Sequence, residues 1–225
     1  MKKKAYQIER TRNTQGIQTQ KSILDIAGRL FGEHGFAGTS MRDISRDSGA
    51  ALGSLVYHFG TKENLYLQTI RRYIVENGKL NSHFEPLLKV DSKDKQAVSN
   101  ALMSSMRNLM EACHGPSKVE HLAGLYTRVI VDGNAAALDM LLKCFADVQK
   151  ELPILVGKLR PDWSKDEVAF WMQLMWSLLQ YMVVAKDLVM HDMGLKKGYT
   201  VAYLNAAARQ FAVYCGMPLG LPAPA

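Results

Sequence analysis

The chain has 225 residues, of which 28 are Lys or Arg and 21 are Asp or Glu, so its formal net charge at pH 7 is +7. This length is sufficient for one large or two modest domains with a hydrophobic core. Cys113, Cys144 and Cys215 are odd in number and lack a C-x-x-C spacing, which argues against a disulfide framework and a zinc finger. We interpret them as small buried groups of a reducing compartment, with a redox sensor as the alternative.

The first predicted helix ends at Gly35. Its apolar residues recur with the 3.6-residue period of one helix face, at Ile23, Ala27, Leu30 and Phe31. Glycine adopts the left-handed backbone conformation that ends a helix without strain, and Phe36 is placed to fold back on Phe31.

Two short helices follow, joined by a glycine turn. Thr39 or Ser40 offers a hydroxyl to cap the first of them, which breaks at Ser48-Gly49. The second runs from about residue 50 to residue 59. Two brief helices joined by a tight turn are typical of the helix-turn-helix unit, which places its second helix in the major groove of DNA. A DNA partner is therefore the first hypothesis.

Residues 19–65 resemble the DNA-binding domain of the TetR family of bacterial repressors. The shared pattern is an apolar-Ala-x-x-Leu-Phe helix, Glu-x-Gly, Thr-Ser-x-x-x-Ile, a turn glycine, Gly53, then Tyr57-His58-Phe59-Gly60-Thr61-Lys62-Glu63 and Leu65. The chain departs from many relatives at Val56, which has no hydroxyl for a phosphate, so Tyr57 is expected to serve instead. The resemblance implies an all-α regulator with a three-helix helix-turn-helix head and a C-terminal helical ligand-binding and dimerisation domain.

The charge distribution supports a nucleic-acid partner independently. Residues 1–80 contain 13 Lys or Arg and 7 Asp or Glu, a net charge of +6, and the rest of the chain has a net charge of +1. A basic region gains affinity for DNA through counterion release. The alternative is that the basic excess only improves solubility. Residues 1–15, with Lys2-Lys3-Lys4, are expected to form a disordered basic arm that either follows the DNA or is a mobile end.

Roles within the head follow from side-chain chemistry. Ser54, Tyr57 and His58 can donate to phosphates or base edges, and small residues on the same helix allow its backbone to approach DNA. Lys62 is the expected phosphate anchor, and Arg46 would add a contact. A metal site at His58 is not supported by any second ligand at helical spacing, and no cofactor is expected. The residues predicted to contact DNA are Thr39, Ser40, Arg42, Ala51, Gly53, Ser54, Tyr57, His58 and Lys62.

The remainder of the chain is predicted to be helical, in a DNA-binding domain over 16–76, an effector-binding and dimerisation domain over 77–216, and a tail without order over 217–225. A long linking helix is expected from Lys62 to a break near Pro86. The sequences Ser117-x-x-Glu120 and Ser164-x-x-Glu167 have the form of capping boxes. The helices expected after the linking helix are 98–113, one opened by Ser117, 135–152 ended by Pro153, 168–190 and 199–215.

The segment 168–190 is the most hydrophobic of the chain. Charged and amide residues such as Gln173 and Lys186 interrupt the roughly 20 apolar residues that a bilayer requires, so we predict no membrane span. A helix that is apolar on all sides must be covered on all sides. The family resemblance implies that the last two helices pair with their counterparts in a homodimer. Twofold symmetry would then place two recognition helices about 34 Å apart on a palindromic operator.

A soft, aromatic-rich set of residues in the middle helices is a candidate effector pocket, because the family arranges these helices around a ligand. Simple core packing is the alternative for each of its members. Few charged residues fall among them, which favours an apolar or amphipathic small-molecule effector. The predicted pocket residues are Met103, Met106, Met110, Leu122, Tyr126, Phe145, Trp171 and Met175.

An enzyme is not indicated, since the chain lacks the G-x-S-x-G, H-E-x-x-H, G-x-G-x-x-G and P-loop patterns. A sequence-independent architectural DNA binder is the nearer alternative, because a basic head alone would satisfy it. The sequence therefore favours a cytoplasmic, DNA-binding transcriptional repressor without a secretory signal, released from its operator by the effector.

Overall fold

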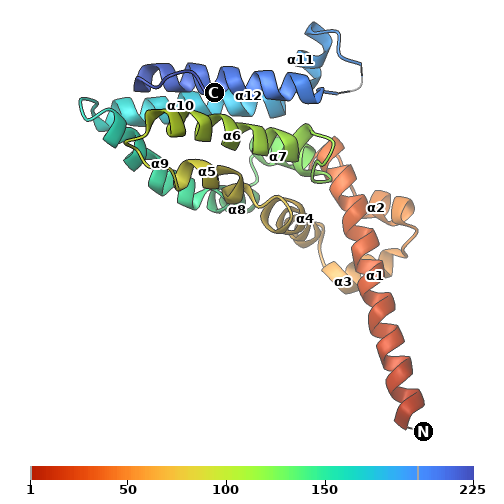
Figure 1. The fold of residues 1–225 in the computed structure, drawn as a ribbon. Helices are drawn as coiled ribbons and strands as arrows, with labels where there is room; N and C mark the ends of the chain where they lie inside the picture. Colours follow the sequence, from red (N-terminus) through yellow and green to blue (C-terminus); the bar gives the residue numbers. More distant parts are fainter. Residues whose placement is uncertain (1, 197) are drawn as a thin grey trace.

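The described residues form helices joined by loops and include no strand, which confirms the predicted all-α class. The computed structural model describes residues 2–196 and 198–225, with side chains from Gly16 onward apart from residue 197. Residues 2–15 are helical, contrary to the disordered arm expected over residues 1–15. Figure 1 shows a small head that includes the long first helix, and a larger layered bundle next to it.

The helices form a head, a connecting segment and a body. The head contains α1 (Lys2–His34), α2 (Met41–Ser48), α3 (Leu52–Phe59) and α4 (Lys62–Ile70). The connecting segment contains a π-helix, η1 (Arg71–Glu76), a 3-10 helix, η2 (Leu80–Phe84), and α5 (Glu85–Leu88). The body contains α6 (Lys95–His114), α7 (Leu122–Asp132), α8 (Ala135–Lys143), α9 (Ala146–Leu159), α10 (Lys165–Val184), α11 (Lys186–Asp192), α12 (Val201–Gly216) and the 3-10 turn η3 (Met217–Leu219).

The end of α1 has the predicted cap. Gly35 adopts a φ of 73° and donates its N–H to the Phe31 carbonyl at 2.9 Å. Phe36 folds back so that its ring stacks 6.3 Å from the ring of Phe31. The apolar stripe that includes Ile23 and Leu30 is buried beneath the other head helices.

The long linking helix predicted from Lys62 to Pro86 is wrong. After Ile70 the chain widens into the π-helix η1, turns at Gly78, and continues as short helices. A Cβ at Gly78 would collide with the Ile74 carbonyl, so a glycine is required where the chain folds back on η1. The connecting segment is therefore a bent path with uncommon backbone geometry, not a straight rod.

The capping box predicted at Ser117 and Glu120 is also wrong. The Ser117 amide instead donates to the Glu111 carboxylate on α6 at 3.2 Å, and α7 begins after His121, whose φ is 59°. A side chain of α6 therefore binds the loop at Ser117, which the local Ser-x-x-Glu motif was expected to turn into a helix cap.

The predicted helix break at Pro153 lies elsewhere. Pro153 is inside α9, and the break falls between α8 and α9, at Cys144-Phe145. Phe145 is buried there, with its ring 4.9 Å from Trp176 and 6.1 Å from Phe84. This aromatic cluster joins three segments that are far apart in the sequence, so it positions the break more strongly than the proline does.

The hydrophobic segment is divided between α10 and α11. Ser164 and Glu167 form the predicted capping box at its start, with the Glu167 amide 3.2 Å from the Ser164 hydroxyl. No single helix in the described ranges is long and apolar enough to cross a membrane. α10 and α11 satisfy that test only together, and the chain bends by 74° between them.

Residues 217–225 pack on the start of α6, contrary to the expected tail without order. Ser99 is buried and donates to the Pro222 carbonyl at 2.7 Å, and Gln96 donates to the Ala223 carbonyl at 3.0 Å. The glycine and prolines here end α12, but side chains of α6 supply the donors that the tail carbonyls need.

Glycines allow α1 of the head to cross α7 of the body at close range. A Cβ at Gly124 would lie 3.2 Å from the Gly32 Cα, closer than ordinary van der Waals contact. Polar contacts hold the same crossing: Arg128 donates to a main-chain carbonyl in the last turn of α1 at 2.5 Å, and Asp132 accepts from the Phe36 amide at 3.0 Å. The position of the head on the body is therefore set largely by α7.

We expect Gly124→Ala to lower the free energy of unfolding by about 1–2 kcal/mol, because the methyl group must push two backbones apart and this outweighs the gain in helix propensity of about 1 kcal/mol. Gly157→Ala is the matched control, since a Cβ at Gly157 in α9 meets no atom within 4 Å. It should stabilise the protein by up to about 1 kcal/mol. Denaturant unfolding measures both, and equal effects would contradict the close crossing.

Candidate nucleic-acid interface

The α2–turn–α3 unit has the geometry of a helix-turn-helix. Gly49 has a φ of 69°, in the left-handed region, and its amide contacts the Arg46 carbonyl at 3.4 Å. The Ser45 hydroxyl donates to the Ala50 carbonyl at 2.7 Å and so ties the turn to α2. Ile44 and Leu55 are fully buried and hold the two helices together.

The outer face of α3 is exposed and is not covered by other parts of the protein. Tyr57 is 84% exposed and Val56 is 53% exposed, whereas Leu55 and Phe59 are buried. A Cβ built at Gly53 meets no atom within 4 Å, so this position has open space in front of the backbone. The helix can therefore bring its main chain close to another molecule along this face.

The residues that were predicted for this helix share its accessible side. Ala51, Gly53 and Tyr57 are exposed, and Ser54 and His58 are half-buried at its edges. Leu52 and Val56 are exposed on the same helix and were missed as candidates. Leu52 precedes Gly53 and Val56 precedes Tyr57. Each pair of neighbours recurs after four residues, which is about one helical turn, and this spacing can be recognised in the sequence.

Thr39 is not available for DNA, which corrects its place among the predicted contacts. Its side chain is 2% exposed, and its hydroxyl donates to the Leu30 carbonyl at 3.1 Å. The cap of α2 is Ser40 instead, whose hydroxyl accepts from the Asp43 amide at 3.1 Å while the Asp43 carboxylate accepts from the Ser40 amide. Thr39 is used to fix α1 against the turn that leads into α2.

The cations of the head differ in their availability. Arg42 is exposed. Arg46 is held between the carboxylates of Asp43 at 3.0 Å and Asp47 at 2.9 Å, so a phosphate would have to compete with both. The ammonium of Lys62 lies 4.3 Å from the centre of the Phe36 ring, which positions it at the start of α4 while leaving it partly exposed.

The predicted effector pocket is corrected by the packing of the body. A pocket of about 480 Å³ lies between α7, α8 and α10, and of the eight predicted residues only Tyr126 and Phe145 line it. Its other walls include Leu138, Trp176 and Gln180. Met106, Met110, Leu122, Trp171 and Met175 are buried in the core and Met103 packs against it, and the Trp171 indole donates to the Cys215 carbonyl at 3.0 Å.

Known proteins resemble the chain in the head and in the whole fold. Residues 23–69 match the family described as bacterial regulatory proteins, tetR family. The HTH-type transcriptional repressor KstR2 of Rhodococcus jostii is 30% identical over 105 residues, which are 44% of this chain and 50% of that protein. The chain thus spans about half the length of this curated relative.

Two solved structures share the helical architecture. A TetR-like transcriptional regulator from Rhodococcus sp. RHA1 superposes with a TM-score of 0.60 at 14% identity, covering 90% of this chain and 96% of that one. A transcriptional regulator from Saccharomonospora viridis, solved in complex with choline, superposes with a TM-score of 0.56 at 16% identity, covering 86% and 95%. These similarities confirm the predicted arrangement of an N-terminal helix-turn-helix and a C-terminal helical domain.

Ser40→Ala should destabilise the head by about 1 kcal/mol near neutral pH, because the cap of α2 is lost. Hydrogen bonds from the Ser40 side chain and backbone lower the pKa of Asp43 from its ordinary 3.8. A carboxyl whose pKa is lower in the folded state stabilises the fold above its unfolded pKa, and that stabilisation disappears as the pH falls through the lowered value. The difference between Ser40→Ala and wild type should therefore narrow below pH 3.8.

Thr61→Ala is the control for this pH dependence, since Thr61 caps α4 by accepting from the Asn64 amide at 3.1 Å without a reciprocal carboxylate. Its effect on stability should not narrow in this way at low pH. Urea unfolding at a series of pH values measures both variants, and parallel pH profiles would refute the role of the Asp43 carboxylate.

Proposed function

We propose that the chain, whose residues 23–69 match the TetR family of bacterial regulatory proteins, is a member of that family and a cytoplasmic, homodimeric repressor of transcription. It binds a palindromic operator and releases it when a small, mainly apolar or amphipathic effector enters the body. The similarity to the repressor KstR2 supports repression over activation of transcription. The fold supports the division into a DNA-binding head and a regulatory body.

The exposed face of α3 is the observation that carries this proposal. A tyrosine that is 84% exposed on an otherwise well-packed head is available to donate to phosphate or a base edge, and the open space at Gly53 permits close approach of the backbone. The basic excess of residues 1–80 adds an electrostatic attraction that does not depend on sequence.

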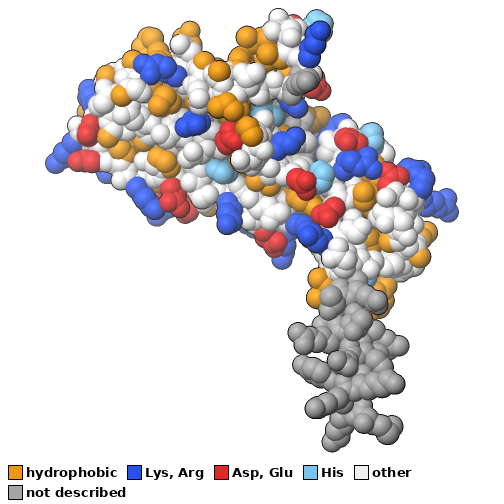
Figure 2. All heavy atoms as spheres, turned by 45° about the vertical axis from the view of Figure 1, so that its right-hand side comes forward, with side chains coloured by type: hydrophobic (Ala, Val, Ile, Leu, Met, Phe, Trp, Pro, Cys, Tyr) orange, Lys and Arg blue, Asp and Glu red, His pale blue; other side chains and the backbone are white. Residues whose placement is uncertain are grey.

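An apolar row on α10 supports dimerisation. Phe170, Leu174, Leu178 and Tyr181 recur at helical spacing and are each about half exposed or more. Figure 2 shows hydrophobic side chains over the edge of the molecule formed by the last helices. Large apolar side chains that line one helix face in this way are typical of a protein–protein interface. A second copy that covers the row through twofold symmetry would double the recognition helices and explain a palindromic site.

The pocket between α7, α8 and α10 is the candidate effector site. Its walls are apolar and aromatic, with amide groups of Gln149, Gln173 and Gln180 but no charged side chain. This lining suits a neutral or weakly polar ligand. The pocket is bounded by α7, which also holds α1, so a ligand that favours one position of α7 would shift the head and change DNA affinity.

A sequence-independent architectural DNA binder is the alternative function, favoured only by the basic charge of the head. Footprinting at moderate salt separates the two. Protection of one palindromic site supports the proposed regulator, and uniform protection of the duplex supports the alternative.

Gly53→Ala should weaken operator binding by at least about tenfold while leaving the fold intact, because its methyl group enters space that the DNA backbone needs; in the free protein alanine favours the helix by up to about 1 kcal/mol. Lys62→Ala should behave differently: it weakens all duplexes alike and lowers the slope of log affinity against log salt by about one. Fluorescence anisotropy with operator and random duplexes measures both. Tight operator binding by Gly53→Ala would exclude close backbone approach.

Leu178→Glu should convert the dimer to a monomer and greatly weaken operator binding, because a carboxylate would be buried in the centre of the apolar row. Ile154→Glu on α9 is the matched control: Ile154 is 50% exposed and Leu178 is 47% exposed, but Ile154 lies outside the row. Sedimentation velocity gives the mass in solution. A dimer that survives Leu178→Glu unchanged would show that the interface lies elsewhere.

A further inference from the structure

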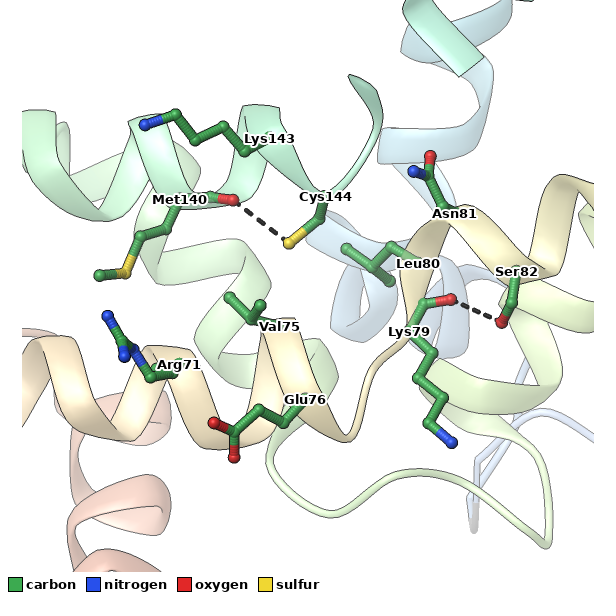
Figure 3. Close-up of a pocket in the computed structure, with 10 residues that line it drawn as sticks. All are labelled: Arg71, Val75, Glu76, Lys79, Leu80, Asn81, Ser82, Met140, Lys143 and Cys144. Carbon is green, nitrogen blue, oxygen red and sulfur yellow. Dashed lines mark hydrogen bonds between the residues drawn. The ribbon is translucent and has the colours of Figure 1, made fainter. Parts of the chain in front are cut away.

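A second cavity, of about 580 Å³, lies outside the candidate effector pocket and shares no lining residue with it. It is formed by η1 and η2 on one side and the end of α8 on the other. Figure 3 shows Val75, Leu80 and the sulfur of Cys144 pointing toward one another across its centre. The volume falls within the range of about 300–1,000 Å³ typical of small-molecule sites.

One cation is placed at the end of this apolar centre. The guanidinium of Arg71 lies below the methyl group of Met140. Within the described ranges Arg71 has no ion pair or hydrogen bond through its side chain, whereas Lys143 at the rim is paired with Asp139 at 2.7 Å. Figure 3 also shows the side chains of Glu76 and Lys79 pointing away from the centre. The centre of the cavity is therefore apolar, with polar groups such as Asn81 and Ser82 in its lining and the free guanidinium at one end.

The walls have unusual backbone geometry. Arg71 and Val75 belong to the π-helix η1, and π-helical turns are rare and often occur at functional sites. Lys79 has a φ of 44°, a left-handed conformation that costs a non-glycine residue about 1–3 kcal/mol. The Ser82 hydroxyl holds this turn by donating to the Lys79 carbonyl at 2.7 Å. Two uncommon backbone features therefore border the same cavity.

We propose that this cavity is a second ligand site, and that it binds an amphipathic carboxylate. The guanidinium of Arg71 would hold the carboxylate, and the chain of the ligand would lie against Val75, Leu80 and Cys144. Arginine suits this role because its planar group donates two parallel hydrogen bonds to a carboxylate. The uncharged lining of the first pocket favours a different class of ligand, so the two sites would respond to different molecules.

The site also lies where a ligand can affect the head. η1 follows α4 without a break, and α4 begins at Lys62 next to α3, whereas α8 belongs to the body. A ligand that contacts η1 and α8 together stabilises one spacing between them. This regulatory consequence rests on the proposed function, but binding of the carboxylate does not.

Cys144 provides a direct measure of occupancy. It lines the cavity and is half-buried, whereas Cys113 and Cys215 are buried and lie elsewhere, so they serve as internal controls. Burial raises the pKa of the Cys144 thiol, and alkylation with N-ethylmaleimide should be followed at about pH 9 to populate the thiolate. Peptide mass spectrometry gives the rate at each cysteine.

Decanoate is the probe, with decanol and decyltrimethylammonium as comparisons of equal chain length. We expect decanoate to slow alkylation of Cys144 at least threefold below its micellar concentration, and the neutral and cationic compounds to protect much less. Unchanged alkylation of Cys144 with decanoate, or equal protection by all three compounds, would overturn the proposed carboxylate site.

Arg71→Gln should raise the decanoate concentration needed for half protection about three- to tenfold, since a partly exposed ion pair is lost. Lys143→Gln is the matched control and should change it little, because Lys143 is already paired with Asp139. Equal behaviour of the two variants would refute the role of Arg71.

Operator affinity measured with and without decanoate tests the regulatory coupling separately. If decanoate protects Cys144 but leaves DNA affinity unchanged, the ligand site stands and its regulatory role is rejected. If the protein binds no duplex at all, only the proposed function is rejected.

Discussion

The contact between Gly32 and Gly124 is the constraint on which the arrangement of the molecule depends. A side chain at Gly124 would push α7 away from the backbone of α1 at Gly32 and weaken the polar contacts that Arg128 and Asp132 make with the end of α1. Because α1 carries the core of the head, this crossing determines how the recognition surface is presented. It also means that any displacement of α7 is passed on to α1 through a close backbone contact instead of through flexible side chains.

Local patterns in the sequence predicted the head well. The cap at Gly35, the turn at Gly49 and the capping box at Ser164 are each formed within a few residues, so their geometry depends little on the rest of the fold. The candidate DNA-contacting residues are exposed or half-buried, with Thr39 as the exception. That threonine satisfies the same motif as Ser40, and only the packing of α1 decides which of the two is buried.

Features that depend on distant residues were not predictable in this way. Glu111 draws the Ser117 loop away from its expected cap, and the cluster around Phe145 moves a helix break away from Pro153. The effector pocket shows the same limit, because a methionine in the core and a methionine at a pocket wall have the same helical spacing. The composition of the middle helices indicates flexible and aromatic side chains that could line a pocket or fill a core. Only the tertiary fold shows that Met106 packs in the core and that Tyr126 lines the pocket.

The π-helix η1 has a consequence for how this chain tolerates changes in length. A π-turn accommodates one residue more than the α-helical turn that it replaces, so it behaves as an insertion absorbed within a helix. Removing one residue from η1 can therefore be compensated by a return to α-helical winding, whereas removing one residue from α4 would rotate everything before it by about 100° around the axis. The phase of the recognition helix relative to the body is thus less sensitive to a change of length in η1 than to the same change in α4.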